Sequence, residues 1–357
     1  MMTGFDRPIS LALSGGGTRA MAYHLGVLKW MAEQGLFEKV ARISTVSGGS
    51  LVMGLIYKSA SFKWPTSKMF LESSLPNVIE ILCSRSLQTE AMLKLACPKN
   101  LCFLLSRANL VAITLEDDWG FNIPISKIPS APQWSINGTN AENGKRFRFK
   151  GSEIGDYDVG YAVAPNLPLA YALAVSAAFP VGIGPLTIRT SDFKWQRKPF
   201  GAPDSEIKVV SLPYERLHLY DGGLYDNLGS ESLFDLGKQE SKHAGDYVVV
   251  SDAGAPLSSG MVFGPISWQR VKRMMDIMSD QTRALRVRTL ISYLKRSSQH
   301  GAYIPIGVEL TGNDSLEAQF ARSYPTSLKI MTKHDCERLI AHGYNVAANR
   351  SDFGFIR

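Results

Sequence analysis

Two consecutive units of strand, glycine turn and helix open the sequence, and they constrain its fold more than any other feature. The apolar run "ISLAL" (9–13) leads into "SGGGTR" and then into a stretch whose apolar residues recur at helical spacing. The unit then repeats, because "ARISTV" (41–46) is rich in strand formers and the turn at Ser47 precedes the apolar "SLVMGLIYK". Such units predict a mostly parallel sheet covered by helices.

The remaining sequence predicts additions to this sheet. Residues 58–130 are rich in Leu, Met and Phe without a strand period, which predicts a helical cap. The pair Asn143-Gly144 predicts a hairpin, and "DYVVVSDAG" (246–254) predicts a central parallel strand. No repeat or linker marks a second unit, so we expect one domain over residues 1–357, with C-terminal helices (267–357) packed on the core.

A long basic helix is predicted between residues 267 and 296. Eight Lys or Arg in this stretch stand against only Asp276 and Asp280. A solvated basic face is one interpretation, and docking on an anionic membrane or reading an anionic activator is the other. The net charge of +7 favours anionic lipid or nucleic acid as partners without choosing between them.

The sequence also predicts a cellular location. The N-terminus has no apolar run that would form a signal peptide, and four prolines interrupt the most apolar window, "VAPNLPLAYALAVSAAFPVGIGPL" (163–186). Four cysteines in a chain of this length do not form a disulfide framework or zinc spacing, so we expect reduced thiols. We therefore expect a cytoplasmic protein that meets the inner membrane only peripherally.

Ser47 stands where a nucleophilic serine would be expected, at the end of a strand and the start of a helix. The pattern G-x-S-x-G would have glycine at the position of Thr45, so the turn alone does not decide the role of Ser47. Gly48 and Gly49 leave space beyond the serine, and a helix N-terminus favours developing negative charge. We expect Ser47 to be a nucleophile, supported by Gly48 and Gly49.

The earlier glycine turn predicts an oxyanion hole. Gly15, Gly16 and Gly17 lack side chains, so their backbone N–H groups can converge on one anion. Arg19 would brace this loop or meet a lipid phosphate. A phosphate-binding turn is the alternative, although the spacing matches neither of the common phosphate-binding glycine motifs.

Several residues compete for the role of general base. Asp221 and Asp252 each end a strand before a glycine-containing turn, whereas Asp226 stands where capping of the local backbone is the commoner role. A Ser-Asp-His triad is the alternative, with a histidine downstream of Asp221 as the third member. The downstream histidines are His243, His300, His334 and His342, while His24 and His218 are expected to be structural.

Taken together, "SGGGTRA", "VSGGS" and "DGGLYDN" resemble the patatin-like phospholipase family. The segments "INGTNAENGKRFRF", "AVSAAFPVGIGPL" and "SDQTRALRVRTLISYL" also look like family segments, so the resemblance extends over most of the chain. It implies a three-layer α/β/α patatin-like fold with a mostly parallel central sheet, and acyl hydrolysis by a Ser–Asp dyad. Residue by residue, it implies Ser47 as nucleophile, Asp221 as base and Gly15–Gly17 as oxyanion hole.

The chain departs from the family pattern at two positions. Ser14 stands where many members carry aspartate, and Thr45 stands where many carry glycine. Neither change removes a catalytic group, but both alter groups that can hydrogen bond in the turns. The sequon at Asn137 is expected to be unused, since nothing in the sequence directs the chain to secretion.

The expected function is a phospholipase A-type serine hydrolase that cleaves carboxylic ester bonds of membrane phospholipids or related acyl lipids. Its partner is the phospholipid surface, and neither a metal, an organic cofactor nor a nucleic-acid polymer is expected. One alternative is a signal-gated phospholipase effector of bacterial antiviral defence, activated by a small anion such as a cyclic nucleotide. Another is a catalytically silent homologue that binds lipid or nucleotide.

Overall fold

The fold is built on one large mixed sheet. The computed structural model describes residues 5–180, 182–198, 204–257, 260, 264, 267, 269–309 and 314–349. Within these residues, twelve strands form a sheet in the order β14-β13-β1-β2-β3-β4-β5-β6-β8-β9, with β10 on β3 and β7 on β10. The strands are β1 Ile9–Leu13, β2 Val40–Thr45, β3 Gln133–Asn140, β4 Lys145–Lys150, β5 Glu153–Asp156, β6 Gly160–Val163, β7 Leu186–Arg189, β8 Trp195–Arg197, β9 Lys208–Val209, β10 Arg216–Asp221, β13 Tyr247–Asp252 and β14 Gly301–Pro305. A separate small sheet pairs β11 Phe234–Asp235 with β12 Glu240–Ser241.

The strands from β14 to β3 are parallel, and those beyond β3 are antiparallel. The predicted parallel core and the strand at 246–254 are therefore confirmed, and β13 lies between β14 and β1. The predicted hairpin at Asn143-Gly144 joins β3 to β4.

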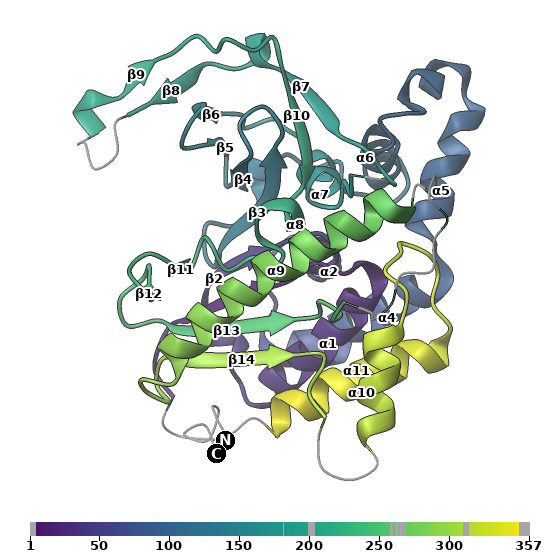
Figure 1. Ribbon diagram of the computed structural model, residues 1–357, viewed down its shortest axis with the longest axis vertical. Helices are drawn as coiled ribbons and strands as arrows, with labels where there is room; N and C mark the ends of the chain where they lie inside the picture. The colour runs from purple at the N-terminus through teal and green to yellow at the C-terminus, as the bar shows by residue number, and fades with distance from the viewer. Residues whose placement is uncertain are drawn as a thin grey trace.

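Helices cover both faces of the parallel strands (Figure 1). They are α1 Gly17–Glu33, α2 Gly48–Ser59, α3 Ser67–Met69, α4 Leu75–Ser84, α5 Leu87–Leu93, α6 Ala108–Asp117, α7 Leu169–Ser176, α8 Gly223–Asp226, α9 Gln269–Leu294, α10 Asp314–Ser323 and α11 Lys333–Ala348. The side chains of Leu11 and Leu13 enter one core with α1 and α11, whereas Ala12 enters a second core with Leu290 of α9. This alternation confirms the expected three-layer α/β/α fold.

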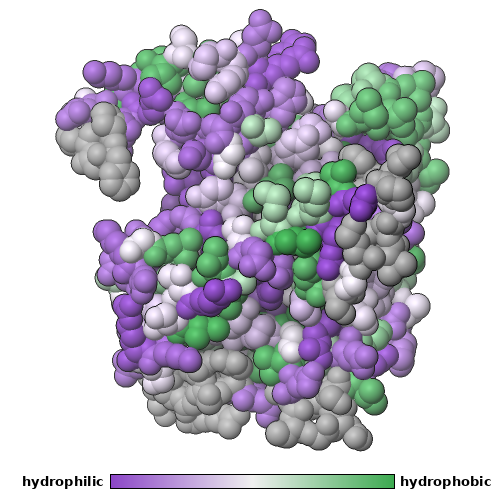
Figure 2. All heavy atoms as spheres, viewed as in Figure 1, coloured by the Kyte–Doolittle hydropathy of each residue, from purple (hydrophilic) through white to green (hydrophobic). Residues whose placement is uncertain are grey.

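The cap is helical, as predicted. No strand lies between residues 58 and 130, where α3 to α6 and intervening turns form a lobe against α7. Green spheres gather over the α5 end of the molecule in Figure 2. The exposed apolar side chains there include Met92, Leu93, Leu101, Leu104 and Leu105. Among the described residues, no helix is both long and apolar enough to cross a membrane.

Helix α9 corrects part of the interpretation of residues 267–296. Two of its arginines are not solvated, because Arg283 pairs with the buried Asp252 and Arg286 pairs with Glu231. These ion pairs attach α9 to the sheet and to the turn after α8. The basic sequence of this helix therefore serves in part to hold it on the core.

Strand β3 brings two distant strand ends together. On one edge of β3, β2 is paired in parallel and ends with Thr45 opposite Ile136. On the same edge, β10 is paired antiparallel and ends with Asp221 opposite Gly138. Strand β4 occupies the whole other edge. The ends of β2 and β10 thus meet beside Asn137, although they are far apart in the sequence.

Candidate active site

The turn after β2 holds Ser47 in a strained conformation. Its backbone has φ 51° and ψ −121°, a region that residues with a side chain rarely adopt and that costs about 1–3 kcal/mol. The turn is held by hydrogen bonds from the Gly49 amide to the Val46 carbonyl (2.8 Å) and from the Leu51 amide to the Ser47 carbonyl (3.0 Å). Strain of this kind is typical of a nucleophile held at the N-terminus of a helix.

The two glycines after Ser47 allow close packing. A Cβ atom on Gly48 would lie 2.3 Å from the Gly17 carbonyl oxygen, and one on Gly49 would lie 2.5 Å from the Leu13 carbonyl oxygen. The turn at Ser47 therefore contacts the earlier glycine loop backbone to backbone. Any side chain at Gly48 would separate the two.

Asp221 lies against Ser47 at the end of β10. The Ser47 hydroxyl donates a hydrogen bond to the Asp221 carboxylate, and the Gly223 amide donates to its Oδ1 at 2.7 Å. The side chain is only 4% exposed. Burial raises the pKa of Asp221 to about 7, although both hydrogen bonds act to lower it. A carboxyl with this pKa can both accept and return a proton near neutral pH.

Backbone amides without partners occur in the two glycine turns beside this pair. Within the described residues, the amides of Gly16, Gly17 and Gly48 have no hydrogen-bond acceptor, whereas the Gly15 amide donates to the Asn227 carbonyl at 3.0 Å. Gly15 instead packs closely on Ser47, since a Cβ added to it would lie 3.0 Å from the Ser47 Cβ. Free amides beside a hydroxyl are the donors that an oxyanion needs.

A buried histidine and an arginine hold the glycine loop. His24 Nε2 donates to the Ser14 carbonyl (3.0 Å) while its Nδ1 accepts from the Ser251 hydroxyl (2.7 Å). Burial lowers the pKa of His24 to about 4, so the ring is neutral and has this tautomer at pH 7. Arg19 is buried and donates to the carbonyls of Tyr324 and Ala253, so it braces the loop and faces no open surface.

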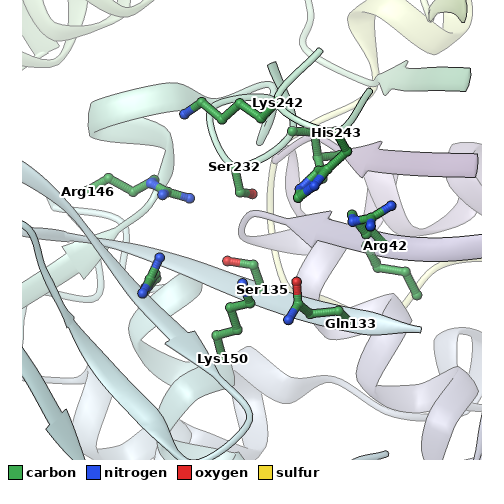
Figure 3. A pocket seen from close by; sticks show the side chains of 11 residues that line it. Arg42, Gln133, Ser135, Arg146, Lys150, Ser232, Lys242 and His243 are labelled. Atoms are coloured by element: carbon green, nitrogen blue, oxygen red, sulfur yellow. The ribbon is translucent and has the colours of Figure 1, made fainter. Parts of the chain in front are cut away.

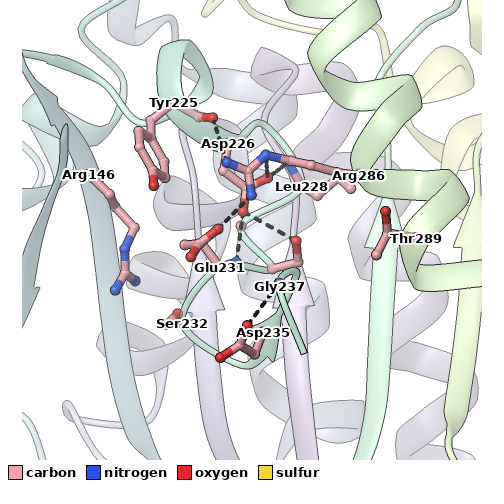
Figure 4. Close-up of polar contacts among 12 residues, drawn as sticks. Arg146, Tyr225, Asp226, Leu228, Glu231, Ser232, Asp235, Gly237, Arg286 and Thr289 are labelled. Atoms are coloured by element: carbon pink, nitrogen blue, oxygen red, sulfur yellow. Dashed lines mark hydrogen bonds and ion pairs between the residues drawn. The ribbon is translucent and has the colours of Figure 1, made fainter. Parts of the chain in front are cut away.

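The two other aspartates are engaged elsewhere. Asp226 accepts hydrogen bonds from the amides of Leu228 and Glu231, the capping role expected of it (Figure 4). Asp252 is fully buried, and its carboxylate accepts hydrogen bonds from Arg283 at 2.6 Å and from the Tyr303 hydroxyl at 2.5 Å. Neither carboxylate is hydrogen bonded to Ser47.

No histidine of the described chain completes a triad. His24 and His218 have the structural hydrogen bonds expected of them, the latter to Glu142 at 2.6 Å. His300 and His342 bond to backbone carbonyls, and His334 lies beside Asp335. Neither Ser47 nor Asp221 has a histidine partner.

No sequence pattern indicated the role of Asn137. Its side chain is 2% exposed, and its Nδ2 donates to the Thr45 carbonyl at 2.9 Å. Its own carbonyl accepts from the Ser176 hydroxyl, which in turn accepts from the Ser47 amide at 3.0 Å. Asn137 thus holds the turn at Ser47, and its burial prevents glycosylation of the folded chain. Asn137 lies opposite both strand ends because β2 and β10 share one edge of β3, and this pairing cannot be predicted from local sequence.

Thr45, one of the two departures from the family pattern, belongs to the same network. Its hydroxyl accepts hydrogen bonds from Trp134 Nε1 at 2.9 Å and from Ser50 at 2.8 Å. Ser14, the other departure, accepts from the Ala253 amide at 2.7 Å. Both side chains therefore stabilise the turns on which the site is built. Among the described residues, no group of three His, Cys, Asp or Glu side chains could hold a metal ion.

Comparisons with known proteins concern the family and the fold. A family model for patatin-like phospholipases matches residues 11–234, more than half of the chain. The structure resembles human GIVD cytosolic phospholipase A2, with a TM-score of 0.56, 13% identity and coverage of 98% of this chain. The same human enzyme in complex with methyl gamma-linolenyl fluorophosphonate matches with a TM-score of 0.54, 16% identity and 98% coverage.

These structural matches have a limited scope. The chain covers 62% and 58% of the lengths of the two solved chains, less than two thirds of each. At such low identity, the similarity shows the fold. Comparison with curated proteins gave no match.

Proposed function

Because the chain belongs to the patatin-like phospholipase family, we propose that it is a serine acyl hydrolase acting on phospholipids or related acyl lipids, with the whole chain as one catalytic domain. The observation that carries this proposal is the hydrogen bond from the strained Ser47 to the buried Asp221, beside unpaired backbone amides. Such a group of a nucleophile, a base and oxyanion donors is suited to acyl transfer.

In the proposed reaction, the Ser47 oxygen attacks the ester carbonyl carbon while its proton passes to Asp221. The amides of Gly16, Gly17 and Gly48 donate to the oxyanion, and one such donor is worth about 3 kcal/mol. Asp221 then returns the proton to the leaving alcohol or lysolipid. It next takes a proton from the water that attacks the acyl-enzyme, and it returns this proton to the Ser47 oxygen as the bond to the fatty acid breaks.

The cap would provide contact with lipid. Its exposed apolar side chains include Leu93 at 67% and Leu105 at 86% exposure. A group of such residues on one lobe is unusual for a surface that meets only water, and it is suited to insertion among acyl chains. We therefore propose peripheral binding through the cap.

Release of fatty acid from phospholipid vesicles tests the proposal. Mass spectrometry of the lipids should show fatty acid and lysophospholipid with the wild type, and neither product with Ser47→Ala or Asp221→Asn. Ser59→Ala is the matched control, because the Ser59 hydroxyl bonds only to the Ile56 carbonyl at the other end of α2. Equal release by Ser47→Ala and Ser59→Ala would refute the proposal.

A further inference from the structure

A positively charged cavity of about 230 Å³ is lined by residues of β2, β3 and β4 and by residues near the β11–β12 sheet. Figure 3 shows side chains from β2, β3 and β4, and from the residues around the small β11–β12 sheet, pointing into it. The charged or ionisable lining residues are Arg42, Arg146, Arg148, Lys150, Lys242 and His243, and none of the eleven lining residues is an acid.

The positive charge of this cavity is only partly neutralised. Arg42 pairs with Asp246, Arg148 pairs with Glu153, and Lys242 pairs with Glu231. Among the described residues, no carboxylate lies within ion-pair distance of Arg146 or Lys150. Arg146 and Lys150 are partly buried, and a partly buried charge without a counter-ion is unfavourable, so an anion in this cavity would be bound favourably.

The electrostatics of the two unpaired residues agree with this. Burial, followed by the positive charge of Arg148, lowers the pKa of both Arg146 and Lys150. The Arg148 Nε is also buried without a hydrogen-bond partner. An anion between these side chains would offset the repulsion among the three positive charges.

We propose that this cavity binds a small phosphate-bearing anion, and that its occupancy is relayed through Asn137 to Ser47. Among the lining residues, only Ile43 and Leu233 are apolar, which leaves no wall for an acyl chain. The cavity is smaller than the roughly 300–1,000 Å³ usual for drug-sized ligands. These features favour a compact anion with one or two phosphate groups, and Arg and Lys are the residues that bind such groups.

A short series of hydrogen bonds joins the cavity to the candidate active site. Arg146 Nη1 donates to Asn137 Oδ1 at 3.1 Å, and so does the Ser135 hydroxyl at 3.2 Å. Asn137 in turn bonds to Thr45 and, through Ser176, to the Ser47 amide. An anion that draws Arg146 toward the cavity would weaken its bond to Asn137 and thereby shift the turn at Ser47.

Calorimetric titration of the purified chain with inorganic pyrophosphate at low salt tests the site. We expect saturable binding, weakened about tenfold by Lys150→Gln, since a charge-assisted hydrogen bond is lost. Lys99→Gln is the matched control, because Lys99 is exposed on the cap, away from the cavity, and the change in net charge is the same. Glycerol 3-phosphate in a parallel titration distinguishes a lipid headgroup from a free polyphosphate, and binding of either compound with this pattern supports the site. Failure of both to bind, or equal weakening by the two variants, overturns it.

The relay rests on the proposed function and is tested separately. The rate at which Ser47 reacts with a fluorophosphonate should change several-fold when pyrophosphate saturates the wild type. Asn137→Ala should bind pyrophosphate without this response, and its binding also shows that the variant is folded. An unchanged rate in the wild type refutes the relay, whereas the absence of any labelling refutes the proposed function and leaves the binding result standing.

Discussion

Replacing Asp221 with asparagine should make the protein more stable at high pH while removing its activity. Burial holds the pKa of this carboxyl at about 7, compared with an ordinary value of 3.8. The folded state therefore keeps the proton to a higher pH than the unfolded state does. Stability from this group is complete below about pH 4 and is lost as the pH rises through 7. Asparagine carries no charge, so the variant does not lose this stability.

The size of the effect follows from the same values. A tenfold change in proton affinity corresponds to about 1.4 kcal/mol, so the carboxylate destabilises the folded state by about 4 kcal/mol at pH 8. At pH 5 less than half of this destabilisation is present. The stability advantage of Asp221→Asn over the wild type should grow by about 2–3 kcal/mol between pH 5 and pH 8. The asparagine Oδ1 can still accept from the Gly223 amide, so the geometry of the turn is retained.

Urea unfolding of both proteins at the two pH values measures this difference. Asp252→Asn is the matched control, because it also neutralises a buried aspartate but removes the closer counter-ion of Arg283 and leaves it only Asp280, at 3.9 Å. That variant should be less stable than the wild type by about 3–5 kcal/mol. If Asp221→Asn is not stabilised, or if its advantage does not depend on pH, the assignment of a raised pKa to Asp221 is wrong.

Three further predictions concern activity. The pH profile of kcat/KM should rise with pH through about 7, because Asp221 must lose its proton to act as a base; a profile flat from pH 5 to 9 would contradict this role. Gly48→Ala should lower the rate of ester hydrolysis by about 100-fold, since its Cβ would collide with the Gly17 carbonyl. The control Gly237→Ala makes only an ordinary van der Waals contact and should be as active as the wild type in the same assay. Ser176→Ala removes the hydrogen-bond acceptor of the Ser47 amide. It should therefore lower the free energy of unfolding by about 1–2 kcal/mol and also lower kcat, as urea unfolding and kinetics measured in parallel would show.

Local patterns were sufficient to predict the strands and turns that carry the site. The apolar run at residues 9–13 is β1 itself, and the turn at Ser47 joins β2 to α2 as expected. These features depend on residues that are neighbours in the sequence. The same holds for the hairpin at Asn143-Gly144.

Local sequence patterns could not choose between Asp221 and Asp252, because both end a strand before a glycine-containing turn, and only the family resemblance favoured Asp221. The choice depends on partners far along the chain. Asp252 lies at the end of β13, and its carboxylate is held by Arg283 and Tyr303, which are 31 and 51 residues away. Asp221 reaches Ser47 because β10 enters the sheet antiparallel to β3, a pairing that no local pattern encodes.

The same reason explains why the cavity was not anticipated. Its positive charges come from β2, β4 and the residues after β12, which are far apart in the sequence and meet only in the folded chain. The basic helix α9 was the more visible candidate for an anion site. The structure shows two of its arginines paired with acids instead.

The central claim is that Ser47 is a nucleophile activated by Asp221. The most direct measurement is the reaction of the intact protein with a fluorophosphonate, followed by mass spectrometry of its peptides. We predict one adduct, on the peptide that carries Ser47, and a rate at pH 8 at least 100-fold lower in Asp221→Asn, since general-base assistance is lost. A folded protein that is not labelled, or that is labelled at another serine, would contradict the claim.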